Sequence, residues 1–530
     1  MNRTTKLSIA LTAALFLSLA QAPAFAQEAA RLAPAEADVF VQVDDLSGWR
    51  AQWKQDPLAE FLRDQGVERR KRHHEAWLDM ARAMDLTPGA LFDAFFGTRI
   101  VLIGDAAEDG SFVLITTMRR GIITDAVTSL GLKEDGQIGE HRLYLTPDGQ
   151  TQVAIHGRQV AMAHKGHLPW LRQVLTLDEE DARLADDEAF RQWMQRLPAG
   201  PHAAVAFARD GEDEVHAFAC RRIGRGLDLH YAGTSEKFDE MLAQVGGAGA
   251  LDFGPLPAST IGATMVNLFD PDPQGAQRLD GLVAPASFKD DVLAGLEAPT
   301  VFFLGEIEGG VLRPQTNFNV PVVGMAIKLK DEATAEHIDT MLGRAFTLVR
   351  MGMAAQGLPP FEASEGSRDG IDYHVLDFGE AVVKKTERED LRGTLRLTMG
   401  RIGDWYLIAS HEDFFRQAIA AHGQPGLSLG AQKALLPVED KTRPILTSVF
   451  RAPFLADHLQ TWLTWWEQER PVSFEAAQDE RPTDPEAKLI RCVRIAAGAL
   501  DHYDTLGAQV WTVEGEEVDI VHARIQVQRR

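Results

Sequence analysis

The feature that most constrains the fold of this chain is a series of sequence patterns that occurs twice in the same order. The nine residues HLPWLRQVL at 167–175 return as HEDFFRQAI at 411–419. Other matched segments keep the same order around both copies: EADVFVQVDDL with ASTIGATMVNLF, LFDAFFGTRIVLIGDA with VLAGLEAPTVFFLGEI, HRLYLTP with DYHVLDF, and PHAAVAFARD with RPILTSVFRA. An ordered series indicates a repeat architecture far more strongly than one short match does. The sequence therefore predicts two tandem, divergent repeats.

Within each repeat, the patterns predict strands joined by short turns. Apolar or alternating runs are separated by turn-forming segments such as those at 105–111, 156–158 and 222–226. Consecutive strands joined in this way must run antiparallel. Amphipathic segments with helical periodicity lie between the strands. We therefore expect an α+β fold, in which each repeat is a mainly antiparallel sheet with helices packed on one face.

The repeated nine-residue phrase predicts a strand-to-helix corner in each repeat. In WLRQVL the apolar residues fall on one side of a helix, and the Arg-Gln pair points away from it. The polar positions of this repeat signature are His167, Arg172, Gln173, His411, Arg416 and Gln417. We favour a structural role for them, because a histidine in a first helical turn is usually a surface or packing residue. The alternative is that His167 and His411 belong to paired functional sites.

Residues 1–26 have the three parts of a secretory signal peptide: a basic start, an apolar run and the cleavage sequence AFA. We expect cleavage near Ala26 and Gln27, and a periplasmic or secreted location; the alternative is an uncleaved N-terminal anchor. After cleavage, no segment approaches the roughly 20 apolar residues that are needed to span a bilayer. The sequence therefore predicts an exported protein without a transmembrane segment.

The rest of the chain divides at a segment rich in glycine and proline, GGAGALDFGPLP, at 246–257. Such segments are typical of linkers. The predicted domains are a first α+β repeat at 27–250 and a second at 251–530.

The charge balance excludes some partners. The chain has 77 acidic and 54 basic residues and a net charge of −23, which repels nucleic acid and anionic membrane surfaces. Its only cysteines are Cys220 and Cys492, so disulfides do not hold the fold together. In an oxidising compartment these two residues either form one bridge or remain free thiols.

The known catalytic and metal-binding motifs give no site. GLSLG around Ser428 fits the pattern of a nucleophile elbow, but it follows a helix and a proline instead of a strand. DPDPQG at 270–275 resembles the start of a calcium loop, yet Gly281 stands where a bidentate glutamate is required. The run His73-His74-Glu75 lacks the ligand spacing of a helical zinc site. We therefore expect no catalytic, metal-binding or cofactor-binding residues from motifs, and no cofactor.

One dense basic cluster interrupts the acidic chain, in ERRKRHH at 68–74. Arg69, Arg70, Lys71 and Arg72 are candidates for contact with an anion or an acidic partner. The alternative is a solvated helix face that pairs with acidic residues of the protein itself.

The start of the mature chain, LAPAEADVFVQVDDLSGW followed by DPLAEFL, resembles an uncharacterised family of exported bacterial proteins that is catalogued as a domain of unknown function. The phrase WYLIASHEDFFRQAI is similar to strand-to-helix phrases of that family. The resemblance implies export and no known activity. We expect a non-catalytic protein that binds another envelope protein or a small ligand. The alternatives are a periplasmic hydrolase whose active site follows no motif and a carrier of an apolar envelope molecule.

Overall fold

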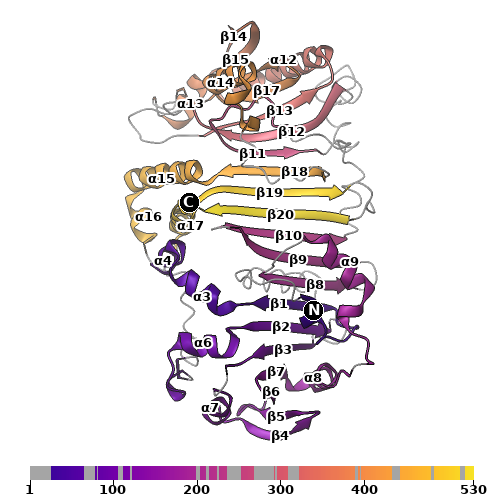
Figure 1. Ribbon diagram of the computed structural model, residues 1–530. Coiled ribbons are helices and arrows are strands. Elements are labelled where there is room, and N and C mark those ends of the chain that lie inside the picture. The colour runs from indigo at the N-terminus through magenta and orange to yellow at the C-terminus, as the bar shows by residue number, and fades with distance from the viewer. Residues whose placement is uncertain are drawn as a thin grey trace. The chain divides into compact units, whose positions relative to one another are not determined.

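The computed structural model describes most of the chain after the predicted signal segment (Figure 1). The described residues are 26–64, 78–79, 81–105, 111–119, 122–178, 180–198, 203–210, 214–223, 226–234, 252–267, 292, 295–307, 321–387, 389, 392–393, 395–431, 442–478, 483–513 and 520–529.

The chain forms two compact units. Unit 1 comprises Met1–Glu236 and Asp519–Gln526, and unit 2 comprises Lys237–Val518 and Val527–Arg530. The sequence predicts one boundary, at residue 250. In the structure, unit 1 ends earlier, at Glu236, and it also includes the segment Asp519–Gln526 near the C-terminus. The difference at the C-terminal end arises because β20 (Ile520–Arg529) pairs with β10 (Gly226–Thr234) of unit 1.

Unit 1 contains an antiparallel sheet with the strand order β4-β5-β6-β7-β3-β2-β1-β8-β9-β10, and the first part of β20 lies beside β10. The strands not yet given are β1 (Val39–Asp44), β2 (Arg99–Asp105), β3 (Ser111–Thr117), β4 (Lys133–Ile138), β5 (His141–Leu145), β6 (Thr151–His156), β7 (Gln159–His164), β8 (Ala204–Asp210) and β9 (Glu214–Ile223). The predicted turn at 156–158 joins β6 to β7, and Gly157 supplies the positive φ of +56° that this turn requires.

The α-helices that the structure describes in unit 1 are α2 (Ala26–Ala30), α3 (Leu46–Lys54), α4 (Pro57–Asp64), α6 (Pro88–Phe96), α7 (Ile122–Ser129), α8 (Leu168–Leu175) and α9 (Glu188–Arg196). Local sequence explains several starts. The side chain of Asp187 accepts a hydrogen bond from the Phe190 backbone N–H at 2.7 Å and caps α9. Thr87 caps α6 in the same way, and Pro88 occupies the first turn.

Unit 2 also contains an antiparallel sheet, with the strand order β14-β15-β16-β17-β13-β12-β11-β18-β19. Its strands are β11 (Thr260–Val266), β12 (Leu296–Gly305), β13 (Val322–Leu329), β14 (Glu362–Arg368), β15 (Ile371–Asp377), β16 (Arg396–Ile402), β17 (Trp405–Ala409), β18 (Thr442–Arg451) and β19 (Tyr503–Val513). Among the described strands, β14 pairs only with β15 and so forms one edge of this sheet.

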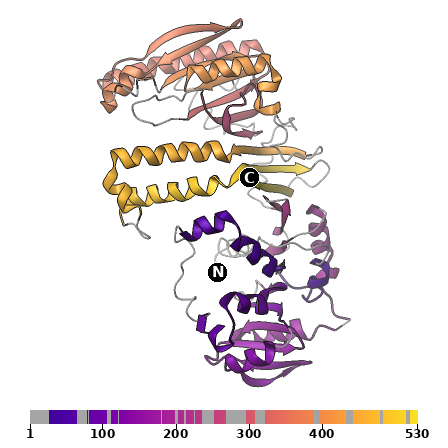
Figure 2. The ribbon, with the colours of Figure 1, turned by 60° about the vertical axis from the view of Figure 1, so that its left-hand side comes forward.

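The described α-helices of unit 2 are α12 (Glu332–Ala355), α13 (Gly379–Thr386), α14 (Glu412–Gly423), α15 (Ala452–Glu469), α16 (Pro471–Ala476) and α17 (Pro485–Leu500). Along the chain, the long helices α15 and α17 come between β18 and β19, two strands that pair directly with each other. The two helices lie side by side (Figures 1 and 2). Their interface has its own apolar core, which includes Leu463, Trp466 and Ile490.

The α+β class and the antiparallel pairing are confirmed, but the prediction that helices cover one face is wrong. In unit 1, Ala154 packs in the core beneath α8 and α9, whereas the adjacent Val153 packs with α6 and α7. In unit 2, Leu407 packs with α14 and the adjacent Tyr406 packs with α12. Neighbouring strand residues point to opposite faces, so both faces are covered. Continuous apolar runs, as opposed to strict alternation, are the sequence sign of such burial.

Among the described helices, none is both long enough and apolar enough to cross a membrane.

Candidate ligand groove

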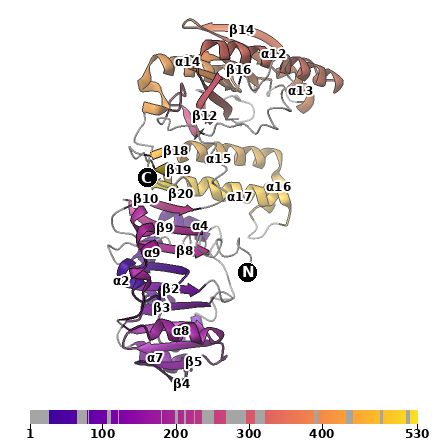
Figure 3. The same ribbon diagram turned by 90° about the vertical axis from the view of Figure 1, so that its right-hand side faces the viewer.

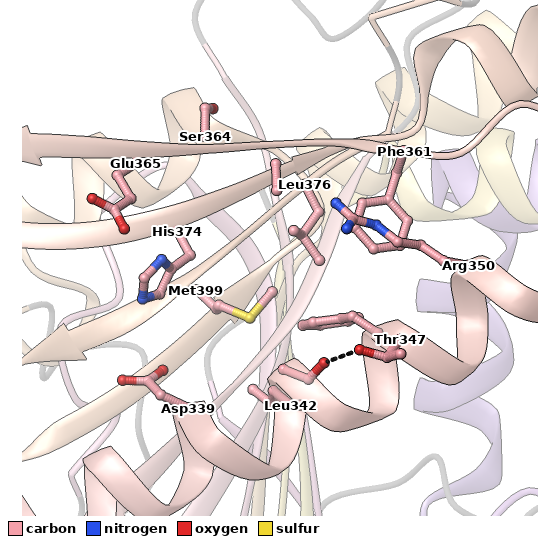
Figure 4. A pocket seen from close by; sticks show the side chains of 13 residues that line it. Asp339, Leu342, Thr347, Arg350, Phe361, Ser364, Glu365, His374, Leu376 and Met399 are labelled. Carbon is pink, nitrogen blue, oxygen red and sulfur yellow. Dashed lines mark hydrogen bonds between the residues drawn. The ribbon is translucent and has the colours of Figure 1, made fainter.

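A groove of about 550 Å³ lies in unit 2, between α12 and the sheet face formed by β14, β15 and β16. Figure 3 shows α12 and β14 close together at the edge of this unit, and Figure 4 shows the side chains that line the space between them. This volume is within the range of small-molecule sites. The groove is the best candidate for a functional site in the part of the chain that the structure describes.

The strand register places the sheet side of the groove. Ala363 of β14 is opposite Leu376 of β15, and Glu365 is opposite His374. His374 is in turn opposite Met399 of β16. Residues that are directly opposite in antiparallel strands present their side chains on the same face. Three neighbouring strands therefore supply a continuous wall, apolar at Leu376 and Met399 and polar at Glu365 and His374.

Helix α12 supplies the other wall. The Asp331 side chain caps its start by accepting a hydrogen bond from the Thr334 backbone N–H at 2.9 Å. Leu342 and Phe346 pack against the core from this helix, and both also line the groove. Gly343 lies between them, and a Cβ added to it would meet no atom within 4 Å. The groove stays open partly because this position has no side chain.

One end of the groove is acidic. Asp339, Glu365 and His374 lie together there (Figure 4). The Tyr406 hydroxyl donates a hydrogen bond to the Asp339 carboxylate. Burial raises the pKa of Tyr406, and the hydrogen bond to Asp339 raises it further, so the phenol remains a donor at neutral pH. The Asp339 carboxylate is thus held in place and has acceptor capacity left for a ligand.

The opposite end is basic. The Arg350 guanidinium lies 4.5 Å from the centre of the Phe361 ring, a cation–π contact that orients the side chain. Phe346 lies beside them, with its ring centre 6.0 Å from that of Phe361. Arg350 is exposed, which leaves its donors available. The groove therefore has an acidic end, an apolar middle and a basic end.

The repeat signature lies elsewhere, in the packing of α14 and α8. The buried Glu412 carboxylate is 2.5 Å from Arg416 and 3.0 Å from Arg396, and it accepts a hydrogen bond from the Tyr373 hydroxyl at 3.1 Å. Arg416 also donates to that hydroxyl at 3.0 Å. This closed network ties α14 to β15 and β16. Arg416 therefore takes part in the packing of α14.

The two signature glutamines make related contacts. Gln417 accepts a hydrogen bond from the Ser259 hydroxyl at 2.6 Å, just before β11. Gln173 donates to the Glu36 carboxylate at 3.5 Å, just before β1. Each glutamine therefore connects its helix to the chain that enters the first strand of its unit.

The signature histidines are helix-cap residues. His411 precedes α14, and its Nδ1 accepts a hydrogen bond from the Asp413 backbone N–H at 3.2 Å. Burial lowers the pKa of His411, which favours the neutral, accepting form. His167 occupies the corresponding place before α8 without a side-chain cap bond, and Arg172 is exposed on that helix. The two histidines belong to different units and line no cavity described here.

The other sequence candidates form no site among the described residues. Ser428 lies between two short helical turns and forms an isolated bridge with Pro257, so the strand-turn-helix of a nucleophile elbow is absent there. The basic cluster with Arg69, Arg70, Lys71 and Arg72, the run at 73–75 and the segment 270–281 lie outside the described residues. Within the described part of the chain, no group of three or more side chains has metal-binding geometry.

Unit 1 contains a buried charge cluster. The Asp228 side chain is fully buried, and its carboxylate lies 2.6 Å from Arg524, 2.8 Å from Arg221 and 2.9 Å from His230. Burial alone raises the pKa of Asp228, but the close contact with His230 and the hydrogen bonds from Arg524 and Arg221 outweigh it and bring the pKa below its usual range. The cluster connects β9, β10 and β20, so its role is structural.

Beside this cluster is a second, smaller cavity of about 160 Å³. Its lining is almost entirely apolar, and includes Val41, Phe218, Leu229 and Ile525. A dry cavity of similar size in another protein holds a molecule as small as benzene.

Neither cysteine forms a disulfide in the structure. Cys220 is buried, and burial raises the pKa of its thiol to about 12, whereas Cys492 is exposed. We expect a thiol-alkylating reagent to label one cysteine, Cys492, in the native protein at pH 8, and both cysteines in denaturant. Mass spectrometry of the labelled peptides checks this. Two labels in the native state would contradict the burial of Cys220, and no label in denaturant without reductant would reveal a disulfide.

No protein-family model matches the chain, and no curated protein or solved structure is significantly similar to it.

No sequence motif pointed to the residues that line the groove. Asp339 and Arg350 lie in a segment that shows only a helical pattern, and Glu365 and His374 lie in segments that read only as strands. The available signal was the length of the pattern after residue 331, which continues through 24 residues despite glycines at 343 and 352. Glycines weaken a helix, so a glycine inside a long helix often has a packing or functional role at its position.

Proposed function

We propose that this chain is an exported, non-catalytic binding protein that holds a small amphipathic ligand in the groove of unit 2. The observation that carries the proposal is the groove itself, which combines an apolar middle with fixed polar groups at its two ends. Binding sites typically have this composition. The signal-like N-terminus and the resemblance to exported proteins support a location in the periplasm or outside the cell.

We also propose that the two units descend from one duplicated repeat. The strand pairings support this, because β1-β2-β3-β7 with β4-β5-β6-β7 in unit 1 has the same succession as β11-β12-β13-β17 with β14-β15-β16-β17 in unit 2. The contacts of Gln173 and Gln417 support it as well.

If the two units descend from one repeat, the groove is a difference between the second repeat and the first. The counterpart of α12 is α7, which has 8 residues where α12 has 24. In unit 1 the corresponding face is filled by an apolar core that includes Ala126 of α7, Val153 and Val160. The long helix in unit 2 extends beyond such a core and frames an open space. This divergence is expected if one repeat kept a scaffold role and the other acquired a ligand.

The two alternatives from the sequence have weaker support. A hydrolase needs a nucleophile or an acid–base pair aimed at a substrate. His374 lies near Asp339 and Glu365 in the groove, but in the described structure no hydrogen bond or ion pair joins it to either carboxylate. A carrier of an apolar envelope molecule would use the apolar cavity of unit 1, but 160 Å³ is far less than the 550 Å³ of the groove. A groove ligand is therefore the better proposal.

The test is native mass spectrometry of the protein recovered from its own cell envelope, without reducing agent. We expect an excess mass that disappears on denaturation. In Gly343→Trp the indole fills the groove, and we expect occupancy to fall at least about tenfold, because the ligand would have to give up most of its contacts.

The matched control is Gly352→Trp, on the same helix. Gly352 also has no atom within 4 Å of an added Cβ, but it does not line the groove. This variant should retain the excess mass. Equal occupancy in both variants would place the ligand elsewhere, and a wild-type protein that carries no ligand and binds none from an envelope extract would remove the proposal.

A further inference from the structure

The two charged ends of the groove are separated by a distance that two elements define independently. On α12, Asp339 and Arg350 are eleven residues apart, which at 1.5 Å per residue corresponds to about 16 Å. On the sheet side, Phe361 and Glu365 are four residues apart, or about 13 Å at 3.3 Å per residue. Figure 4 shows Asp339, Glu365 and His374 at one end and Arg350 with Phe361 at the other. A ligand that reaches both ends is therefore elongated.

The charges also define the polarity of such a ligand. Two carboxylates, Asp339 and Glu365, form the acidic end and favour an ammonium group. Arg350 at the other end favours a carboxylate, because its guanidinium offers paired donors. Between the ends, Leu342, Leu376 and Met399 present apolar surface. The complementary molecule has a positive head, an apolar body and a negative tail.

We propose that the groove binds a short extended peptide of four or five residues with free termini and apolar side chains, its N-terminus at Asp339 and Glu365 and its C-terminus at Arg350. An extended chain spans about 3.3–3.6 Å per residue, so this length bridges about 13–16 Å. The inference rests on the proposed function, since it names the ligand class of the same groove.

Other elongated molecules match the groove less well. A fatty acid would use Arg350 and leave Asp339 and Glu365 unpaired, and a diamine would leave Arg350 unpaired. A nucleotide would pair its phosphates with Arg350, but its neutral base would bring no positive charge to Asp339 and Glu365. Only a molecule with opposite charges at its two ends pairs every charged group that lines the groove.

The experiment is isothermal titration calorimetry of the purified full-length mature protein with the tetrapeptide Leu-Ala-Leu-Ala. Three comparison probes are the same peptide with an acetylated N-terminus, the same peptide with an amidated C-terminus, and the dipeptide Leu-Ala. We expect each blocked terminus to weaken binding about tenfold, since a charge-assisted hydrogen bond contributes on the order of one decade in affinity. The dipeptide, too short to reach both ends, should bind at least about tenfold more weakly.

Variants assign each terminus to its end. In Arg350→Gln, we expect the free and the amidated peptide to bind equally, while the preference for a free N-terminus remains. In Glu365→Gln, the preference for a free N-terminus should decrease. Arg344→Gln is the control, because Arg344 is exposed on α12 outside the groove, and it should keep both preferences.

The outcomes separate this inference from the proposed function. Equal affinity for the free and blocked tetrapeptides would overturn it, and so would the absence of peptide binding. If the peptides fail while Gly343→Trp still loses an envelope-derived mass, the groove is a binding site for another class of ligand. If the peptides fail and Gly343→Trp also keeps the envelope-derived mass, both proposals fail.

Discussion

Replacing Asp228 by asparagine should destabilise the protein by about 3–5 kcal/mol, the usual cost of removing one partner from a buried ion pair. The side chain is fully buried, and Arg221 and Arg524 both depend on its charge. Asparagine has nearly the same size, so the loss reflects the missing charge and not a cavity. Urea denaturation followed by tryptophan fluorescence measures the difference. Glu134→Gln is the control, because Glu134 is exposed on β4 of the same unit, and it should change stability by less than about 0.5 kcal/mol.

The effect of Asp228 should depend on pH with a definite sign. Its folded-state pKa is lowered relative to the unfolded value of about 3.9. The stabilisation is therefore fully present above about pH 4 and is lost as the pH falls through the folded-state pKa. The difference in the free energy of unfolding between the wild type and Asp228→Asn should be constant from pH 5 to 7 and should decrease in stronger acid. If this difference in the free energy of unfolding increased in acid, the cluster would not hold an ionised carboxylate.

Whether the sequence predicts the contacts of the Asp228 cluster depends on how far apart the contacting residues lie along the chain. Arg221 and Asp228 are cross-strand neighbours in the hairpin formed by β9 and β10, and the turn at 222–226 predicts this hairpin. Arg524 lies almost 300 residues later. No local pattern links it to Asp228, because the pairing of β20 with β10 is decided by the packing of the whole unit. The hairpin was predictable, and the charge cluster was not.

The groove illustrates the same limit. Helix α12 and strand β15 are kinds of element that local periodicity can indicate. Periodicity does not predict which of their polar residues face each other, since that depends on how α12 crosses the sheet. The assumption of one covered face failed for a related reason. In β1, five consecutive residues are buried, and covering both sides of such a strand requires helices that the local pattern does not place.

The signature helices were predictable because nine consecutive residues contain the apolar pattern that forms the buried face of each helix. Phe414 of α14 is fully buried and stacks on Phe303 of β12, with ring centres 4.8 Å apart. In the same position of the phrase, Trp170 of α8 is buried, and its indole N–H donates to the Ile103 backbone carbonyl on β2 at 3.4 Å. Each side chain thus fixes its helix to the second strand of its unit.

Truncating either of these two side chains to alanine should therefore cost about 3–5 kcal/mol of stability, because each change removes a large buried ring and leaves a cavity. Urea denaturation of Phe414→Ala and Trp170→Ala measures both losses, with circular dichroism as the probe so that the removed indole does not alter the signal. Phe454→Ala is the control, since that ring is 37% exposed, and it should cost clearly less. If the two signature variants keep wild-type stability, the repeated phrase does not anchor the core, and a functional role for His167 and His411 would have to be reconsidered. Losses of similar size in both units would instead show that one packing solution operates twice in the chain.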